Sequence, residues 1–236
     1  IAAELVWYFT GRKDANFITP YAKFWNQIAN KDGSVNSAYG NLIFSESNEH
    51  YYNQYQWALE SLIKDKDSRQ AILHFNKPSH QWNGNKDFVC TLNGIFQIRD
   101  NKLNFTIDMR SNDLILGTPT DVAFFCLLQM QMLEHLRKYY PELELGTYTH
   151  IAHSLHLYER HFDLVSEMLM KSFNPTSFPE MREFLIDPQG QALSGIKEIE
   201  DEMIQCNDVI NTSEFTPTPK DDLLHQWISD AIFLDI

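Results

Sequence analysis

A β-hairpin predicted over residues 88–110 constrains the fold of this chain more than any other sequence feature. Apolar and polar side chains alternate along residues 103–110, and a period of two is typical of a strand with one buried and one solvated face. The apolar series consists of Leu103, Phe105, Ile107 and Met109. Arg-Asp-Asn-Lys at residues 99–102 predicts a tight turn, and residues 88–98 predict the preceding strand.

The hairpin is expected to bring Cys90 and Arg110 together, because both lie near its open end. A thiol beside a fixed cation can be held as the thiolate, the form that attacks electrophilic carbon. Arg110 followed by Ser111 also suits an anionic group such as phosphate. Taken alone, Cys90 would more often be a small buried hydrophobe, as we expect for Cys126. The arginine at the same end of the hairpin favours a binding corner instead.

A helix is predicted to run from Thr118 to about Tyr140. Thr118 suits the N-cap, Pro119 the first helical position and Asp121 the third. An acid at this point stabilises the helix dipole, so the pattern alone favours a structural role for Asp121. The functional alternative is that Asp121 projects from the start of the helix into a pocket.

The remaining elements are predicted from periodicity and chain breakers. Helices are expected over residues 1–10, 20–29, 51–63, 198–202 and 227–234, strands over 71–75 and 143–158, and a linker over 216–219. The first residues resemble the middle of a helix, so an N-terminal part is expected to be missing. A chain of 236 residues, 43% of them hydrophobic, suits one large domain or one domain with an extension.

Charge and cysteine content narrow the class of partner. The net charge of −13 weighs against a broad duplex-DNA surface, because affinity there depends on neutralising phosphates. An anionic small molecule would need a few local arginines instead. No apolar run reaches the length of a membrane span, and three widely spaced cysteines fit a reducing compartment. We therefore expect a cytoplasmic protein with no membrane contact and no direct nucleic-acid contact.

Four histidines raise the alternative of a metal site. His150, His153 and His156 are spaced by three residues, and His161 follows. The region lacks a clear helical apolar stripe and a closely placed acidic ligand. We therefore expect no metal ion here.

A series of short motifs, in order, resembles the thymidylate synthase family over about residues 1–165. The matching pieces are Glu4-Leu5-Val6-Trp7-Tyr8, Trp25, Tyr39-Gly40, Asp67-Ser68-Arg69, Cys90, Arg110-Ser111-Asn112-Asp113, Gly117, Asp121 and His156-Leu157-Tyr158-Glu159-Arg160-His161. The resemblance implies an α+β, α/β sandwich-like fold, in which helices pack on a large mixed sheet that is used for dimerisation. It divides the chain into a catalytic domain, residues 1–170, and a divergent C-terminal extension, residues 171–236.

The resemblance also implies the main catalytic roles. Cys90 resembles the nucleophile that adds to C6 of a pyrimidine, and Glu4 the glutamate that organises proton transfer and water. Arg110 and Ser111 resemble the pair that binds the nucleotide phosphate. Arg69 resembles the arginine that the other subunit of a homodimer contributes.

Further positions complete the implied pocket. His156 and Tyr158 resemble the residues that hold the sugar 3′-hydroxyl, and Tyr39 resembles a pocket residue near the reacting carbon. The implied nucleotide-binding residues are Arg69, Arg110, Ser111, Asn112, Asp121, His156 and Tyr158. The implied residues around the folate are Trp25, Ile28, Asp113 and Gly117. The implied co-substrate is 5,10-methylenetetrahydrofolate.

Departures from the usual pattern point to one branch of the family. The nucleophile is usually preceded by Pro and followed by His, whereas Val89 and Thr91 flank it here. Ile28 replaces the second of two pocket tryptophans. Gln70 replaces the arginine that is expected after Arg69. Asp121 replaces the asparagine that reads uracil. The Cys-Thr pair, this aspartate and the 154–162 run together resemble the phage deoxycytidylate hydroxymethylase branch.

Asp121 is expected to choose the base. A carboxylate offers only acceptors, which suits the 4-amino group of cytosine, and its protonated form can also donate to N3. Uracil O4 would face an acceptor, a buried mismatch that costs on the order of 1–3 kcal/mol. A water molecule could bridge the aspartate to uracil, so dUMP stays an alternative substrate.

The implied reaction is transfer of one carbon to C5 of the nucleotide. Addition of Cys90 to C6 makes C5 nucleophilic, and C5 takes the methylene group from the folate. Water then adds to the exocyclic methylene, where a thymidylate synthase would use hydride. Ile28 in place of an indole leaves room for this water, and Glu4 is expected to position it. The alternatives are a dUMP hydroxymethylase, a thymidylate synthase, or an inactive nucleotide-binding scaffold.

Overall fold

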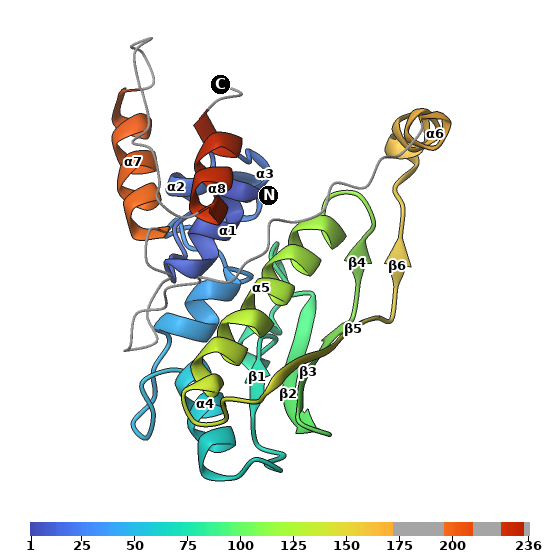
Figure 1. The fold of residues 1–236 in the computed structure, drawn as a ribbon. Helices are drawn as coiled ribbons and strands as arrows, with labels where there is room; N and C mark the ends of the chain where they lie inside the picture. The colour runs from blue at the N-terminus through green and yellow to red at the C-terminus, as the bar shows by residue number, and fades with distance from the viewer. Residues whose placement is uncertain (172–195, 210–222, 234–236) are drawn as a thin grey trace.

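The fold is an α+β arrangement in which helices cover one face of a mixed sheet (Figure 1). The computed structural model describes residues 1–171, 196–209 and 223–233. The four strands lie in the order β1-β2-β3-β5, where β3 and β5 pair in parallel and the other pairs are antiparallel. The strands are β1 (Ile72–His74), β2 (Thr91–Arg99), β3 (Lys102–Met109) and β5 (Glu144–Ala152).

The predicted hairpin is confirmed. Asp100 and Asn101 both have positive φ, the conformation of a two-residue hairpin turn that matches strand twist. The apolar series of β3 is buried against the helices, whereas the alternating polar residues are partly exposed. Strand β2 begins at Thr91, however, and not at residue 88, because a register shift between Thr91 and Asn93 disturbs the ladder at this end. Cys90 therefore lies in the bend that precedes the strand.

Two helices build most of the core. Helix α1 (Ala2–Phe9) is buried on almost every side, and α5 (Thr118–Arg137) crosses the sheet. Aromatic rings join them, with Phe124 of α5 at 4.8 Å from Tyr8 and 5.1 Å from Phe9. Gly40 lies against α1, where a Cβ would fall 1.6 Å from the carbonyl oxygen of Tyr8. Only glycine allows this approach.

The other described helices and short strands surround this core. They are α2 (Ala15–Ile18), α3 (Phe24–Ile28), the π-helical turn η1 (Asn41–Ser45), α4 (Gln54–Lys64), η2 (Pro78–His80), β4 (Asn112–Asp113), β6 (Leu155–His156), η3 (Glu159–His161), α6 (Phe162–Met170), α7 (Ile196–Val209) and α8 (Leu223–Phe233). Strands β4 and β6 pair in parallel as a separate small sheet. Figure 1 shows β6 and α6 projecting away from the main body.

Several predicted boundaries were wrong. Gly117, not Thr118, is the N-cap of α5, so Pro119 occupies the second helical position and Asp121 the fourth. The helix ends at Arg137, three residues early, and turns follow it. The helix predicted over residues 20–29 is reduced to α3, and the acidic helix predicted at 198–202 extends over all of α7. The linker predicted at 216–219 lies outside the described residues.

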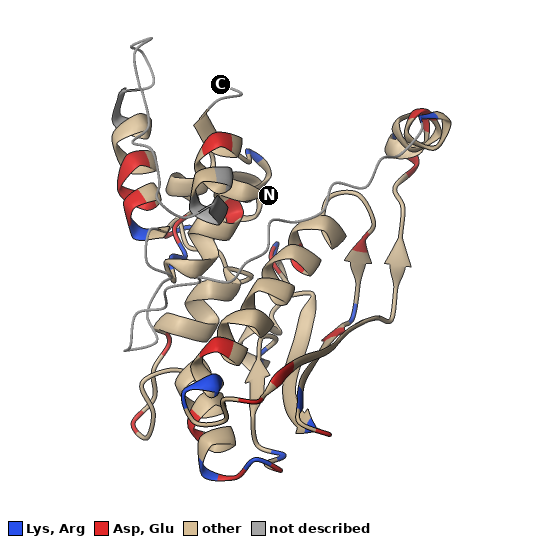
Figure 2. Ribbon diagram, viewed as in Figure 1, with Lys and Arg blue, Asp and Glu red and all other residues tan. Residues whose placement is uncertain are grey.

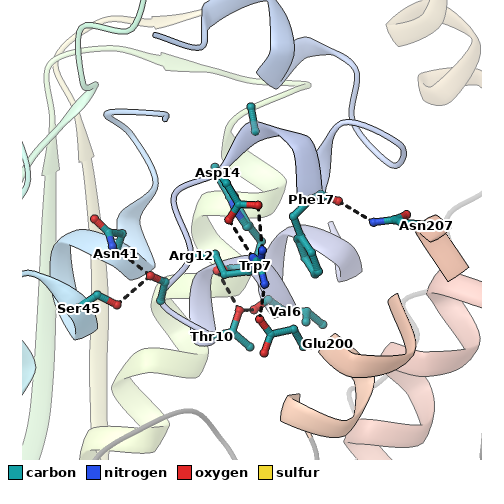
Figure 3. A network of polar contacts seen from close by, with 12 residues as sticks. Val6, Trp7, Thr10, Arg12, Asp14, Phe17, Asn41, Ser45, Glu200 and Asn207 are labelled. Atoms are coloured by element: carbon teal, nitrogen blue, oxygen red, sulfur yellow. Dashed lines mark hydrogen bonds and ion pairs between the residues drawn. The ribbon is translucent and has the colours of Figure 1, made fainter. Parts of the chain in front are cut away.

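The two C-terminal helices pack against α1, so the predicted docking helix at the end of the chain is confirmed as α8. A polar network joins α7 to the turn after α1 (Figure 3). Arg12 binds Asp14 through two hydrogen bonds of 2.9 Å and donates a third, also 2.9 Å, to Glu200 of α7. Asn207 donates to the carbonyl oxygen of Phe17 at 3.2 Å. Glu200 is only 2% exposed, whereas the side chain of Arg12 is 29% exposed, so solvent screens this ion pair in part.

Loss of the buried carboxylate should loosen the C-terminal helices. We expect Glu200→Ala to lower the free energy of unfolding by about 1–2 kcal/mol, because it removes a buried acceptor for Arg12, while partly exposed Arg12 stays bonded to Asp14. Urea unfolding followed by circular dichroism measures this change. Asp201→Ala, which removes an exposed acid on the same helix, is the matched control and should change stability by less than about 0.5 kcal/mol. Equal losses in both variants would show that the pair contributes nothing.

Candidate active site

The open end of the hairpin brings Cys90 and Arg110 into contact, as the sequence predicted. The backbone N–H of Arg110 donates to the carbonyl oxygen of Cys90 at 2.9 Å, and its guanidinium lies 3.5 Å from the Cys90 sulfur. The guanidinium also donates to the carbonyl oxygens of Val89, at 3.2 Å, and Phe88. Its position next to the thiol is therefore fixed by the same loop that carries the cysteine.

The surroundings of Cys90 nevertheless favour the thiol over the thiolate. Burial raises the pKa of Cys90 above its ordinary value, and the carboxylates of Asp121 and Asp87 add to the rise. Arg110 acts in the opposite direction but does not outweigh burial. The expectation that the cation alone holds a thiolate is therefore not met. Arg110 lowers the cost of forming the thiolate when an electrophile is present.

Asp121 is the second chemical feature of the site. Its side chain is 7% exposed and accepts a hydrogen bond of 2.6 Å from the amide of Asn112 on β4. Burial raises the pKa of Asp121 to about 7, and the nearby charge of Glu4 contributes, whereas the bond from Asn112 lowers it. The carboxyl group therefore titrates near neutral pH, as an acid–base or donor–acceptor group requires. Because Asp121 is buried and bonded to Asn112, its surroundings differ from those of an exposed acid that only stabilises the start of a helix.

Glu4 is held beside Asp121 by two neutral donors. Its Oε1 accepts from the indole N–H of Trp25 at 2.7 Å, and its Oε2 accepts from the hydroxyl of Thr120 at 3.1 Å. Trp25 is itself packed against Trp7, with ring centroids 5.0 Å apart. Because both oxygens are directed by fixed donors, the carboxylate has a defined orientation toward the start of α5.

Tyr39 closes the buried side of the site. Its ring is 4% exposed and stacks on Tyr8 at 5.3 Å and Phe125 at 5.6 Å. Burial raises the pKa of its hydroxyl well above the ordinary value, and the charges of Asp121 and Cys90 add to this. Thr91 next to the nucleophile is also fully buried. The predicted residues Cys90, Glu4, Asp121 and Tyr39 thus lie together.

Arg69 lies at the other end of the sheet. It precedes β1, whose residue Ile72 pairs with Ile95, and its neighbour Asp67 lies 3.8 Å from Arg99 near the hairpin turn. Basic and acidic residues are interleaved in this region, at the bottom of Figure 2. Arg69 is exposed and does not reach the site of its own chain. Its predicted role in a partner subunit stays a prediction.

The predicted sugar-binding residues lie on the β4–β6 edge. His156 pairs through its backbone with Asp113, and its ring contacts Tyr158 edge-on at 5.0 Å. Tyr158 is 45% exposed. Ser111 is half-buried and directly follows Arg110. These residues therefore form an open rim next to the buried part of the site.

Asp113, one of the residues implied for folate, has one carboxyl oxygen that is bonded and one that is not. One oxygen of Asp113 accepts from the backbone N–H groups of Ile115 and Leu116, at 2.7 and 2.9 Å. Its other oxygen, Oδ2, is buried with no hydrogen-bond partner among the described residues. A buried acceptor of this kind fits a donor supplied by a ligand. Gly117 lies at the end of the same loop, at the N-cap of α5. Ile28 is half-buried and is the last residue of α3.

A cavity of about 440 Å³ lies behind Glu4, between α1, the 20–22 turn and the two C-terminal helices. It is lined by Ile1, Ala2, Ala3, Glu4, Pro20, Tyr21, Ala22, Cys206, Asn207, Ala231 and Ile232. The residues predicted to contact folate do not line it. The cavity and the Cys90 site therefore share only Glu4.

Sequence reasoning missed three polar residues that support the site. Thr120 orients Glu4, His150 of β5 lies 3.3 Å from the amide oxygen of Asn112, and the hydroxyl of Tyr148 lies 2.7 Å from the other ring nitrogen of His150. Thr120 directly precedes Asp121, and His150 was considered only as one of four metal-ligand candidates. His153 pairs with Asp108 at 2.8 Å. Across the ranges that the structure describes, no three His, Cys, Asp or Glu side chains are grouped to hold a metal ion.

The fold and this arrangement of residues agree with comparisons to known proteins. The family model described as thymidylate synthase matches residues 1–212. The chain belongs to the thymidylate synthase family, an enzyme family.

Two phage proteins show the range of substrates among its relatives. The chain is 37% identical to the deoxycytidylate 5-hydroxymethyltransferase of Enterobacteria phage T6 over 174 residues, which is 70% of this chain and 69% of that protein. It is 31% identical to the deoxyuridylate hydroxymethyltransferase of Bacillus phage SP01 over 166 residues, which is 66% of this chain and 42% of that protein.

A solved structure supports the fold. The thermostable thymidylate synthase A from Bacillus subtilis superposes with a TM-score of 0.61 at 22% identity, covering 82% of this chain and 72% of that one. The predicted α+β fold, with helices packed on a mixed sheet, is therefore confirmed. None of the helices in the described ranges combines the length and apolar composition that a bilayer span requires.

Proposed function

We propose that this protein is a pyrimidine nucleotide C5 hydroxymethyltransferase that converts dCMP to 5-hydroxymethyl-dCMP, with 5,10-methylenetetrahydrofolate and water as co-substrates. One observation carries the choice of base. Asp121 is a buried carboxyl group at the position where the family resemblance expects an asparagine that reads uracil. The similarity to phage deoxycytidylate 5-hydroxymethyltransferases supports the same choice. The proposed location is the cytoplasm, and for a phage-encoded protein the cytoplasm of the host.

Each step uses a group whose position is described above. The Cys90 sulfur forms a bond to C6, assisted by the guanidinium of Arg110. C5 then bonds to the transferred carbon and loses its proton, the bonds from this carbon to the folate nitrogens break, and the nitrogens take up protons as tetrahydrofolate departs. Water, oriented by the carboxylate of Glu4, bonds to this carbon through its oxygen and releases a proton, and the bond from sulfur to C6 breaks, which returns Cys90 to its starting form. No electrons are transferred to or from the folate, so no dihydrofolate forms.

The proposed active form is a homodimer in which Arg69 reaches the partner's site. Arg69 is exposed at the far end of the sheet from Cys90, as a residue that serves another subunit would be. The sheet face opposite the helices also carries partly exposed apolar side chains, among them Ile151, which is 42% exposed. Strand β5 lies at the edge of this sheet. These features suit burial against a second copy.

A second candidate is a dUMP hydroxymethylase or a thymidylate synthase. The raised pKa of Asp121, about 7, favours it, because the protonated acid can donate to uracil O4. The relative from phage SP01 is named for deoxyuridylate.

The test is incubation of the full chain with methylenetetrahydrofolate and each of dCMP, dUMP and CMP, with products identified by mass. We expect dCMP to gain the mass of CH₂O and absorbance at 340 nm to stay constant. If product forms from dUMP and not from dCMP, the substrate is dUMP. Rising absorbance would mean oxidation to dihydrofolate and a thymidylate synthase. A chain that binds nucleotide but turns over none of the three would be a scaffold.

A further inference from the structure

Asn112 is bonded through both ends of its amide. Its Nδ2 donates to Oδ2 of Asp121 at 2.6 Å. Its Oδ1 accepts from the hydroxyl of Thr118, at 2.5 Å, and lies 3.3 Å from Nε2 of His150. The side chain is 3% exposed, so these contacts are not exchanged for water. Its position therefore differs from that of a residue that points into an open pocket.

The hydrogen bonds that link Tyr148, His150 and Asn112 are all donated in the same direction, toward Asn112. The hydroxyl of Tyr148 lies 2.7 Å from Nδ1 of His150. Burial raises the pKa of Tyr148 and lowers that of His150, so the phenol keeps its hydrogen and the ring is neutral. The phenol then donates to Nδ1, which leaves the hydrogen of the ring on Nε2, facing Oδ1 of Asn112. Each residue along this chain donates to the next, and Asp121 receives the last hydrogen.

Close packing keeps the amide in place. Gly117, at the N-cap of α5, approaches so closely that a Cβ there would lie 3.0 Å from Nδ2 of Asn112. The amide therefore lies between the helix start and strand β5. With donors facing Oδ1 and a carboxyl oxygen facing Nδ2, a flip of the amide would break its bonds at both ends.

We infer that Asn112 is a positioning residue that keeps Oδ2 of Asp121 as an acceptor, so that any proton on this carboxyl group resides on Oδ1, and that it thereby sets which base the site accepts. This inference rests on the proposed function, since it concerns the same pocket. The structure gives Asp121 two unequal oxygens, one that only accepts and one that is free to donate.

Unequal oxygens matter because a freely protonated acid could imitate a carboxamide. An acid that could place its proton on either oxygen would satisfy cytosine in one form and uracil in the other. With the proton confined to Oδ1, cytosine is matched when its N3 faces Oδ1 and its amino group faces Oδ2. Uracil in the same pose meets acceptor against acceptor and donor against donor. Asn112 therefore converts an ambiguous acid into a selective one.

Ionisation of Asp121 depends on the groups that face it. They are Glu4 and Tyr8 from α1, Tyr39, Cys90, Asn112 from β4 and Tyr148 from β5. Asn112 favours the ionised form, whereas burial and Glu4 oppose it. Loss of the amide donor should therefore raise the pKa of Asp121 further above its ordinary value.

The test compares Asn112→Leu, which keeps the volume and removes the donor, with Gln129→Leu. Gln129 is a buried amide on α5 that donates to the carbonyl oxygen of Leu103 at 2.8 Å, away from the site. For each variant, kcat/KM for dCMP and dUMP is measured from pH 5.5 to 9. We expect Asn112→Leu to reduce the ratio of the two values at least about tenfold, toward one. The pKa of Asp121 in its profile of kcat/KM against pH should rise by about one pH unit.

The outcomes separate this inference from the proposed function. Gln129→Leu should lose stability but keep the wild-type ratio and pH profile. An unchanged ratio and pH profile in Asn112→Leu, with wild-type turnover intact, would overturn the positioning role. If the wild type prefers dUMP and Asn112→Leu loses that preference, the choice of cytosine is overturned. The role of Asn112 in setting the base preference would then still be supported. Wild type that acts on neither nucleotide would refute the function and with it this inference.

Discussion

Asp121→Asn combined with Asn112→Asp should reverse the base preference, so that the double variant takes dUMP in place of dCMP. The carboxylate at position 112 accepts from the amide nitrogen at position 121, so this carboxamide offers a donor to uracil O4 and an acceptor to its N3–H, and it cannot match both groups of cytosine in the same pose. Asp121→Asn alone should keep the preference for dCMP, because its amide oxygen takes the place of Oδ2 and accepts from Asn112. Two hydrogen-bond mismatches of about 1–2 kcal/mol each predict a change of at least about 100-fold in the ratio of kcat/KM values. Competition between the two nucleotides, with products counted by mass spectrometry, measures it.

The control is Asp108→Asn, which neutralises a carboxylate on β3 that pairs with His153 outside the site. It should keep the preference for dCMP. If the double variant also keeps that preference, the side chains at positions 112 and 121 do not read the base.

Asp121→Asn alone should reveal the titration of Asp121 through stability. Its pKa is raised from 3.8 to about 7, so the folded state holds a proton that the unfolded chain has released. The stabilising contribution of this proton is complete below pH 4 and is lost as pH rises through 7. Asp121→Asn should therefore gain stability relative to wild type between pH 4 and pH 8, by up to about 4 kcal/mol. If the difference in unfolding free energy between Asp121→Asn and wild type does not depend on pH, the raised pKa of Asp121 is contradicted.

Cys90→Ala should abolish turnover, with a loss of at least about 10⁴-fold in kcat, because no other group can form the bond to C6. Nucleotide binding should survive, since the alanine fits the space and Arg110 stays bonded to the loop carbonyls. Isothermal calorimetry with dCMP and the product assay measure the two effects separately.

Cys126→Ala is the matched control, because Cys126 is a partly buried thiol on α5. It should keep full activity. Alkylation of wild type by iodoacetamide should accelerate as pH rises, because burial holds Cys90 as the thiol at neutral pH. Turnover that persists in Cys90→Ala would exclude covalent catalysis by this residue.

The hairpin could be predicted because its signals are local. Alternation over residues 103–110 and a tight turn fix the register, and the register places Cys90 beside Arg110. The start of α5 was misplaced by one residue, since Thr118 suits an N-cap but its hydroxyl is bonded to Asn112 and to the carbonyl oxygen of Asp113. A tertiary contact prevailed over a local preference there.

The chemistry of the site depended on tertiary structure. The raised pKa of Asp121 follows from burial, and its bond to Asn112 requires β4 to pass the start of α5. The net effect on Cys90 also could not be predicted, because it is a balance between burial and Arg110. The roles of Arg69, His156 and Tyr158 came from the family resemblance and stay predictions.

The packing of α1 sets an order of events during protein synthesis. This helix carries Glu4 near the beginning of the chain, yet it contacts α7 and α8 near the end. A growing chain on the ribosome has made Glu4 and Cys90 long before it has made the helices that cover α1. The apolar surface of α1 must therefore stay partly uncovered until α7 and α8 have left the ribosome, and Glu4 acquires its final surroundings only then.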